Sequence, residues 1–323
     1  SAERSDLIEP MNDSLGRGVP CDMAWYNEPR LPEAFRQRLM LCRWESFDVT
    51  AYEVASRGAS FAAQGVPLLT TDENARPTGI TVGPDGRIYF TCSYLAGNVA
   101  SPYCSSDVVV IDLADARSAP KFEPYDETNL TAAELWAELA RPSWFRRRTA
   151  HQEILRRGGE LLDEAATRLI AAKADDPLLE HLVWLAAASR RDDARKKLFE
   201  IALSSEHPAR VAALRALADL PADHATDQGF DTALTARDPQ AQLAALGALF
   251  ADERSLPFTA VAQLAASDDD YLRQTATRLL ARRAALEDIL TLARSNEPTA
   301  RLAGILIAGR RLTEPSRDEP PSA

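Results

Sequence analysis

A short apolar segment recurs along the last two thirds of the chain at intervals of 29 to 35 residues. The six copies start at Pro142, Pro177, Pro208, Pro239, Asp269 and Pro298. Apolar residues return every three to four positions, which predicts a helix in each copy and second helices over residues 132–140, 161–174, 194–203, 230–236, 258–266 and 286–293. Proline fits the first turn of a helix, and an acidic residue just before it, such as Asp238 or Glu297, stabilises the positive helix end. A unit of about 30 residues with two helices predicts a stack of helical pairs over residues 130–312.

The chain before residue 126 has the composition of strands rather than helices. Stretches rich in β-branched and aromatic residues are separated by Gly, Pro, Asn and Asp, which are turn residues. The sharpest turn is Gly83-Pro84-Asp85-Gly86, where proline presets the first turn angle and glycine supplies a positive φ. The sequence therefore predicts three parts: a strand-rich region over residues 1–126, a helical region over residues 127–312 and a disordered, proline-rich tail over residues 313–323.

Composition excludes several classes of protein. The chain has 37 Lys and Arg against 48 Asp and Glu, for a net charge of −11. Nucleic acids and anionic membranes are poor partners for such a chain, because phosphate binding needs a positive surface. No stretch approaches the roughly 18 apolar residues that a transmembrane helix requires. Only four of the 37 basic residues are lysines, and because this bias is spread over the whole chain we interpret it as genomic composition.

Several parts of the chain resemble known families. The helical pairs resemble HEAT repeats. Residues 20–44 and the strand-turn-strand over residues 76–90 resemble late blades of a glucose/sorbosone-dehydrogenase-like β-propeller. The passage into residues 135–150 resembles a family of membrane-bound dehydrogenases in which a propeller runs into helical repeats. The resemblance covers about residues 20–310 and implies a partial, incomplete β-propeller of about two blades followed by an α-solenoid of about six HEAT-like repeats.

Two blades cannot close a ring, because propellers have four or more four-stranded blades. We therefore expect the missing blades upstream in the same polypeptide or in a separate chain, or else an open sheet with an unpaired edge. The chain starts with Ser1 and no signal peptide follows, so we expect a processed product or an excerpt of a longer protein. The loop over residues 93–103 lacks the arginine that relatives carry there, which argues against quinone or anionic-substrate binding, and no haem segment is present.

In a propeller, the loops between strands hold the functional surface. Here those loops gather candidate cofactor-binding residues (Asn74, Arg76, Tyr94 and Asn98) and candidate metal ligands (Asp72 and Glu73). Carboxylate and amide oxygens could hold Ca²⁺, and Arg76 could orient a sugar or carboxylate. The alternative is that all six are solvated turn residues. Catalytic residues stay unknown.

All four cysteines lie in the first 104 residues. Cys21 and Cys42 fall on consecutive strands, and Cys92 and Cys104 flank a long loop, so two disulfides could form. Disulfides would place the chain in an oxidising, periplasmic or other extracytoplasmic compartment. The alternative is four free thiols. No Cys-x-x-Cys pair occurs, which disfavours zinc-ribbon and thioredoxin chemistry.

Several residues in the helical region have structural interpretations. The four histidines occur singly and do not have metal-ligand spacing. The basic runs at residues 146–148 and 190–191 are expected at helix ends as ion-pair partners. Trp136, Trp144 and Trp184 have the spacing of packing anchors between repeats.

Two functions remain open from the sequence. The resemblance implies the C-terminal part of an extracytoplasmic sugar or alcohol dehydrogenase, a quinoprotein-like oxidoreductase that uses a quinone and Ca²⁺ when intact and is inactive as this chain alone. The alternative is a non-catalytic scaffold for protein–protein interaction that binds a protein partner in the HEAT groove. No complete set of catalytic residues decides between them.

Overall fold

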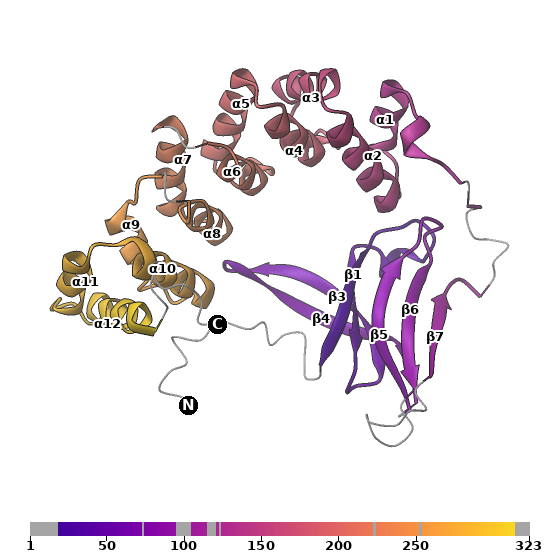
Figure 1. Ribbon diagram of the computed structural model, residues 1–323, viewed down its shortest axis with the longest axis horizontal. Helices are drawn as coiled ribbons and strands as arrows, with labels where there is room; N and C mark the ends of the chain where they lie inside the picture. The colour runs from indigo at the N-terminus through magenta and orange to yellow at the C-terminus, as the bar shows by residue number, and fades with distance from the viewer. Residues whose placement is uncertain are drawn as a thin grey trace, which may run out of the picture. The chain divides into compact units, whose positions relative to one another are not determined.

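The computed structural model describes residues 19–72, 74–94, 105–114, 121–122, 124–221, 224–251 and 254–313. Strands come first and helices follow (Figure 1). Four strands pair in the order β1 (Pro20–Tyr26), β2 (Arg38–Arg43), β3 (Asp48–Arg57) and β4 (Ser60–Thr70). A second sheet has the order β5 (Ala75–Val82), β6 (Ile88–Tyr94) and β7 (Ser105–Ile111). The pairs β1–β2, β2–β3, β5–β6 and β6–β7 are all antiparallel.

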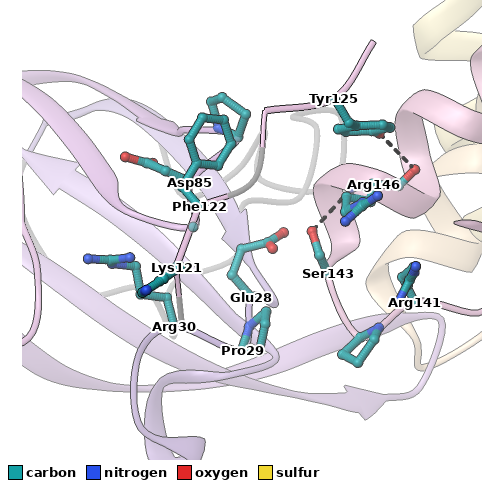
Figure 2. A pocket seen from close by; sticks show the side chains of 13 residues that line it. Glu28, Pro29, Arg30, Asp85, Lys121, Phe122, Tyr125, Arg141, Ser143 and Arg146 are labelled. Carbon is teal, nitrogen blue, oxygen red and sulfur yellow. Dashed lines mark hydrogen bonds between the residues drawn. The ribbon is translucent and has the colours of Figure 1, made fainter. Parts of the chain in front are cut away.

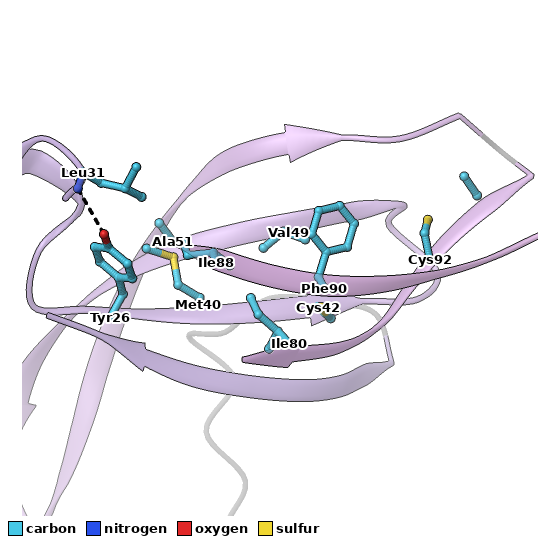
Figure 3. Close-up of a cluster of buried hydrophobic side chains, with 11 residues drawn as sticks. Tyr26, Leu31, Met40, Cys42, Val49, Ala51, Ile80, Ile88, Phe90 and Cys92 are labelled. Carbon is cyan, nitrogen blue, oxygen red and sulfur yellow. Dashed lines mark hydrogen bonds between the residues drawn. The ribbon is translucent and has the colours of Figure 1, made fainter. Parts of the chain in front are cut away.

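The expected partial β-propeller is wrong. The described strands form two small antiparallel sheets, of four and three strands, and neither is closed. Buried side chains from both sheets meet in one shared core (Figure 3). Its members are Tyr26, Leu31, Met40, Cys42, Val49, Ala51, Ala75, Ile80, Ile88, Phe90 and Cys92. Because the sheets bury apolar side chains against each other, they form a local two-sheet core rather than blades in a ring, and further blades are not proposed.

The tyrosine at the end of β1 joins this core to the turn between β5 and β6. The hydroxyl of Tyr26, fully buried, donates to the carbonyl of Gly86 at 2.9 Å and accepts from the N–H of Leu31 at 3.1 Å. The turn predicted at Gly83–Gly86 is confirmed: the N–H of Gly86 donates to the carbonyl of Gly83 at 3.0 Å, and Gly86 has a φ of +77°.

Two short 3₁₀ helices, Glu33–Phe35 and Glu127–Asn129, precede the α-helices, which begin at residue 132. Their bounds are α1 (Ala132–Glu138), α2 (Trp144–Arg157), α3 (Glu160–Ala171), α4 (Leu179–Ser189), α5 (Asp192–Leu203), α6 (Arg210–Ala218), α7 (His224–Leu234), α8 (Pro239–Ala248), α9 (Phe258–Leu264), α10 (Asp270–Arg283), α11 (Leu286–Ala293) and α12 (Pro298–Thr313). From α4 onward the even-numbered helices pack on one another in succession, and α5, α7 and α9 form a second row against them (Figure 1). None of the described helices has the length and apolar character needed to cross a membrane.

Acidic caps start several of these helices as the sequence predicts. The carboxylate of Asp238 accepts from the N–H of Gln240 at 3.0 Å, and that of Glu297 accepts from the N–H of Thr299 at 3.0 Å. These contacts satisfy backbone donors that a helix leaves unpaired at its first turn.

The chain forms two compact units that do not divide at residue 126. Within the described residues, one unit comprises 19–56 and 61–161, and the other comprises 57–60 and 162–313. Helices α1 and α2 therefore belong with the sheets. The N–H of Trp144, at the start of α2, donates to the carbonyl of Asn27 at 3.2 Å. The expected tail lies outside the described residues except for Thr313, which ends α12.

Arginines connect successive helical pairs. Arg254, only 2% exposed, donates to the carbonyls of Leu217 at 3.1 Å and Leu220 at 2.8 Å. Arg283 in turn donates to the carbonyl of Arg254, and Arg311 to that of Ala284 at 2.8 Å. A guanidinium group has five donors in a rigid fork, so it can satisfy several helix-end carbonyls at once where an ammonium group would fit less well. Part of the arginine excess thus has a structural role that composition alone does not reveal.

Candidate functional site

A pocket of about 200 Å³ lies within the first unit, between the sheets and the start of α2 (Figure 2). Four separate segments line the pocket. They contribute residues 28–30, residues 84–86, then Lys121, Phe122 and Tyr125, and finally Arg141, Pro142, Ser143 and Arg146. Side chains of both charges and two aromatic rings line the pocket. Most of the charged groups have partners within the protein.

Glu28 anchors the helical side of the pocket. Its side chain is almost fully buried, and its carboxylate accepts from the N–H of Phe145 at 2.7 Å and from the hydroxyl of Ser143. Burial raises the pKa of Glu28, and these hydrogen bonds oppose the rise. Because the carboxylate satisfies donors at the start of α2, we assign Glu28 a role in holding this helix rather than in binding a ligand.

Arg30 and Asp85 are also committed to the fold. The guanidinium of Arg30 binds both oxygens of Asp112, at 2.6 and 2.8 Å, and Arg87 shares the same carboxylate at 2.8 Å. The hydrogen bond from Arg30 holds the pKa of Asp112 well below its usual range. Asp85 accepts from the hydroxyl of Tyr89 at 2.8 Å. Arg87 also contacts the carboxylate of Asp85 at 3.4 Å, so two arginines face two carboxylates here.

A second pair of arginines shares Glu138. Arg146 binds its carboxylate at 2.6 Å, and Arg141 does so at 3.3 Å. The guanidinium of Arg146 also lies 4.3 Å from the ring centroid of Tyr125, a cation–π contact that fixes one aromatic wall of the pocket.

Two residues that line the pocket, Lys121 and Phe122, are exposed to solvent. Lys121 is exposed and has no hydrogen-bond or ion-pair partner in the described part of the chain. The ring of Phe122 is 45% exposed. Sequence reasoning missed this pocket because its segments are up to 118 residues apart, from Glu28 to Arg146. The one available signal was a rare lysine, Lys121, next to an aromatic residue.

Four of the predicted cofactor and metal residues are described, and they lie at one end of the second sheet: Asp72, Asn74, Arg76 and Tyr94. Asp72 accepts from the N–H groups of Asn74 at 2.8 Å and Ala75 at 3.1 Å, as in a local turn. Ala75 pairs with Tyr94 in the β5–β6 ladder, so the structure brings Asp72, Asn74 and Tyr94 near one another. Glu73 and Asn98 lie outside the described residues.

Arg76 is held by aromatic rings. Its guanidinium lies 5.2 Å from the ring centroid of Trp44 and 4.6 Å from that of Phe47, and it donates to the carbonyl of Trp44 at 3.3 Å. In the described residues, no three His, Cys, Asp or Glu side chains gather closely enough to hold a metal ion. Asp72 is already used by backbone N–H groups, so the described donors at the predicted place do not fit a Ca²⁺ site.

Cys21, Cys42 and Cys92 are free thiols in the structure, and Cys104 lies outside the described residues. Of the two alternatives left open by the sequence, the structure has free thiols at Cys21 and Cys42, because the register pairs Cys42 with Asp22 instead. Adjacent residues of a strand point to opposite faces, so Cys21 is exposed while Cys42 is buried in the core. The predicted Cys92–Cys104 pair is not described.

Four helices of the second unit share one pattern of exposure. In α4, α6, α8 and α10, two buried residues are followed by an exposed residue and then by two more buried residues. The exposed positions are Trp184, Arg215, Gly247 and Arg278, which we call the exposed line. Trp136 is buried as expected, but the interpretation of Trp184 as a packing anchor is wrong, since its side chain is 37% exposed.

No protein-family model matches this chain, and no curated protein shows significant similarity to it.

Proposed function

We propose that the helical unit is a protein-binding scaffold that takes an acidic segment of a partner protein along the exposed line. The observation that carries this proposal is the recurrence of one solvent-facing position in the even-numbered helices α4, α6, α8 and α10, each time with two buried residues on either side of it. Packed helices lie about 8–10 Å apart, so the line extends over roughly 25–30 Å. An extended peptide covers that length with about eight residues.

Charge and aromatic character favour an acidic partner. Arg215 and Arg278 stand out on a chain whose net charge is −11, and Arg190 is also exposed, directly after α4. Trp184 adds a half-exposed indole of the kind that dominates binding energy at interfaces. Gly247 leaves the middle of the line open, because a Cβ there would meet no heavy atom within 4 Å.

The test uses a fluorescein-labelled ten-residue peptide of alternating Glu and Leu, with anisotropy as the readout. We expect saturable binding that weakens at least tenfold in Arg215→Glu and in Gly247→Trp. Both positions are exposed, so neither change should disturb the fold. Arg237→Glu makes the same charge change at an exposed position outside the line and should bind normally. Equal loss in all three variants, or no binding by the unaltered chain, would contradict the proposal.

A second candidate is the oxidoreductase activity implied by the resemblance, acting in an extracytoplasmic compartment in the intact protein. What favours it is the grouping of Asp72, Asn74 and Tyr94 at one end of the second sheet. Because the described donors do not fit Ca²⁺, no catalytic step is derived through that ion. Dye reduction by the intact, full-length protein with glucose, pyrroloquinoline quinone and Ca²⁺ tests this candidate, and a rate equal to that without protein contradicts it.

A further inference from the structure

We propose that the pocket of Figure 2 binds a small organic anion, a carboxylate or phosphate monoester on a short aromatic body. This inference is independent of the scaffold proposal, since the pocket lies in the other compact unit.

The charge of the pocket is the first support. Its carboxylates are engaged by the fold: Glu28 by the start of α2, and Asp85 by the hydroxyl of Tyr89. The pocket arginines share their partners. Asp112 serves both Arg30 and Arg87, and Glu138 serves both Arg141 and Arg146. The Asp112 group is balanced, because Arg87 also contacts the carboxylate of Asp85 at 3.4 Å. The Glu138 group has one more positive than negative charge, and Lys121 adds an ammonium with no partner among the described residues. An anion entering the pocket would therefore neutralise existing charge.

The aromatic lining is the second support. Phe122 follows Lys121 directly and is 45% exposed, a large fraction for a phenyl ring. Tyr125 presents a ring whose position is fixed by Arg146 at 4.3 Å. Figure 2 shows Phe122 and Tyr125 around the same pocket as Lys121 and Arg141. A flat apolar body would cover these rings while its acid group meets the ammonium of Lys121 and the half-exposed guanidinium of Arg141.

The volume limits the size of the ligand. About 200 Å³ is below the roughly 300 Å³ at which pockets for drug-sized molecules begin. The pocket suits a single ring with one acid group and is too small for a dinucleotide or an oligosaccharide.

The scarcity of lysine supplies a direct test. Reductive methylation with ¹³C-formaldehyde keeps the charge of each lysine and labels the chain amine and only four side chains: Lys121, Lys173, Lys196 and Lys197. The labelled chain is titrated with benzoate and followed by ¹³C NMR. We expect saturable shifts confined to the Lys121 signal, which Lys121→Gln identifies by its absence.

Three further ligands and two variants separate the alternatives. Phenyl phosphate should shift the Lys121 signal as benzoate does, inorganic phosphate should act at least tenfold more weakly, and benzyl alcohol should have no effect. Benzoate detected by saturation-transfer NMR should bind at least tenfold more weakly to Lys121→Gln and to Phe122→Ala, both changes at exposed positions. Lys173→Gln, at an exposed position in the other unit, should bind as the unaltered chain does. Equal shifts of all four lysine signals, or none at all, would overturn the proposal.

Discussion

Replacing Tyr26 by phenylalanine removes one oxygen atom from the centre of the two-sheet core. That oxygen donates to the carbonyl of Gly86 and accepts from the N–H of Leu31, at 2.9 and 3.1 Å. Burial raises the pKa of Tyr26 to about 12, so its hydroxyl keeps its proton at any ordinary pH. Tyr26 is 0% exposed, so water has no easy access to the groups left behind. Each buried group without a partner costs about 1–3 kcal/mol, so we expect a loss of about 2–4 kcal/mol in the free energy of unfolding.

Urea unfolding followed by circular dichroism measures this loss, and hydrogen exchange at the Leu31 amide reports it locally. The matched control is Tyr89→Phe, which removes a hydroxyl from a half-buried tyrosine of the same sheets. Asp85 there keeps the N–H of Arg87 at 3.1 Å as a partner, so the control should cost at most about 1 kcal/mol. If both variants cost the same, or the Leu31 amide exchanges no faster in Tyr26→Phe, the role assigned to the Tyr26 hydroxyl is refuted.

Three other outcomes follow from the structure. Iodoacetamide should alkylate the exposed Cys21 in the folded chain but Cys42 only after unfolding, because Cys42 is buried and burial raises the pKa of its thiol to about 12. Mass spectrometry detects the alkylation, and equal labelling of both thiols in the folded chain would contradict their placement. Arg254→Lys should lower the free energy of unfolding by about 1–3 kcal/mol, since an ammonium cannot reach all the carbonyls that the guanidinium satisfies, and a urea midpoint unchanged from that of the unaltered chain would count against this. Hydrogen bonds from Arg156 and Arg157 lower the pKa of Glu153 to about 2. Its stabilising contribution is therefore present above the unfolded pKa near 4.5 and is lost as the pH falls toward 2. Glu153→Gln should flatten that part of the stability–pH curve, and an unchanged slope would show that this ion pair does not matter.

Local features of the fold could be predicted from the residues because they depend on neighbours in the chain. The turn at Gly83–Gly86 follows from proline and glycine at set positions, and Asp238 and Glu297 cap helices because their carboxylates reach donors two residues away. The prediction of a partial propeller was wrong because it depended on contacts between segments that are distant in the chain. Alternating apolar residues identify a strand and its turn, but they do not say which other sheet covers its inner face.

The candidate sites also depend on contacts between distant segments, which the sequence pattern does not contain. The pocket joins segments around Glu28, Asp85, Lys121 and Arg146, and no short pattern connects residues so far apart. Strand order allowed a Cys21–Cys42 disulfide, yet a pairing register that puts Asp22 opposite Cys42 sends the two thiols to opposite faces.

The sequence by itself determined where strands give way to helices and where several helices begin, since periodicity, turn residues and caps act within a few residues along the chain. Only the tertiary structure decided which apolar faces meet, which charges are already neutralised and which surfaces stay open. Trp184 illustrates the difference: its helical spacing is that of a core residue, but whether a neighbour covers it depends on packing between helices that the spacing does not contain.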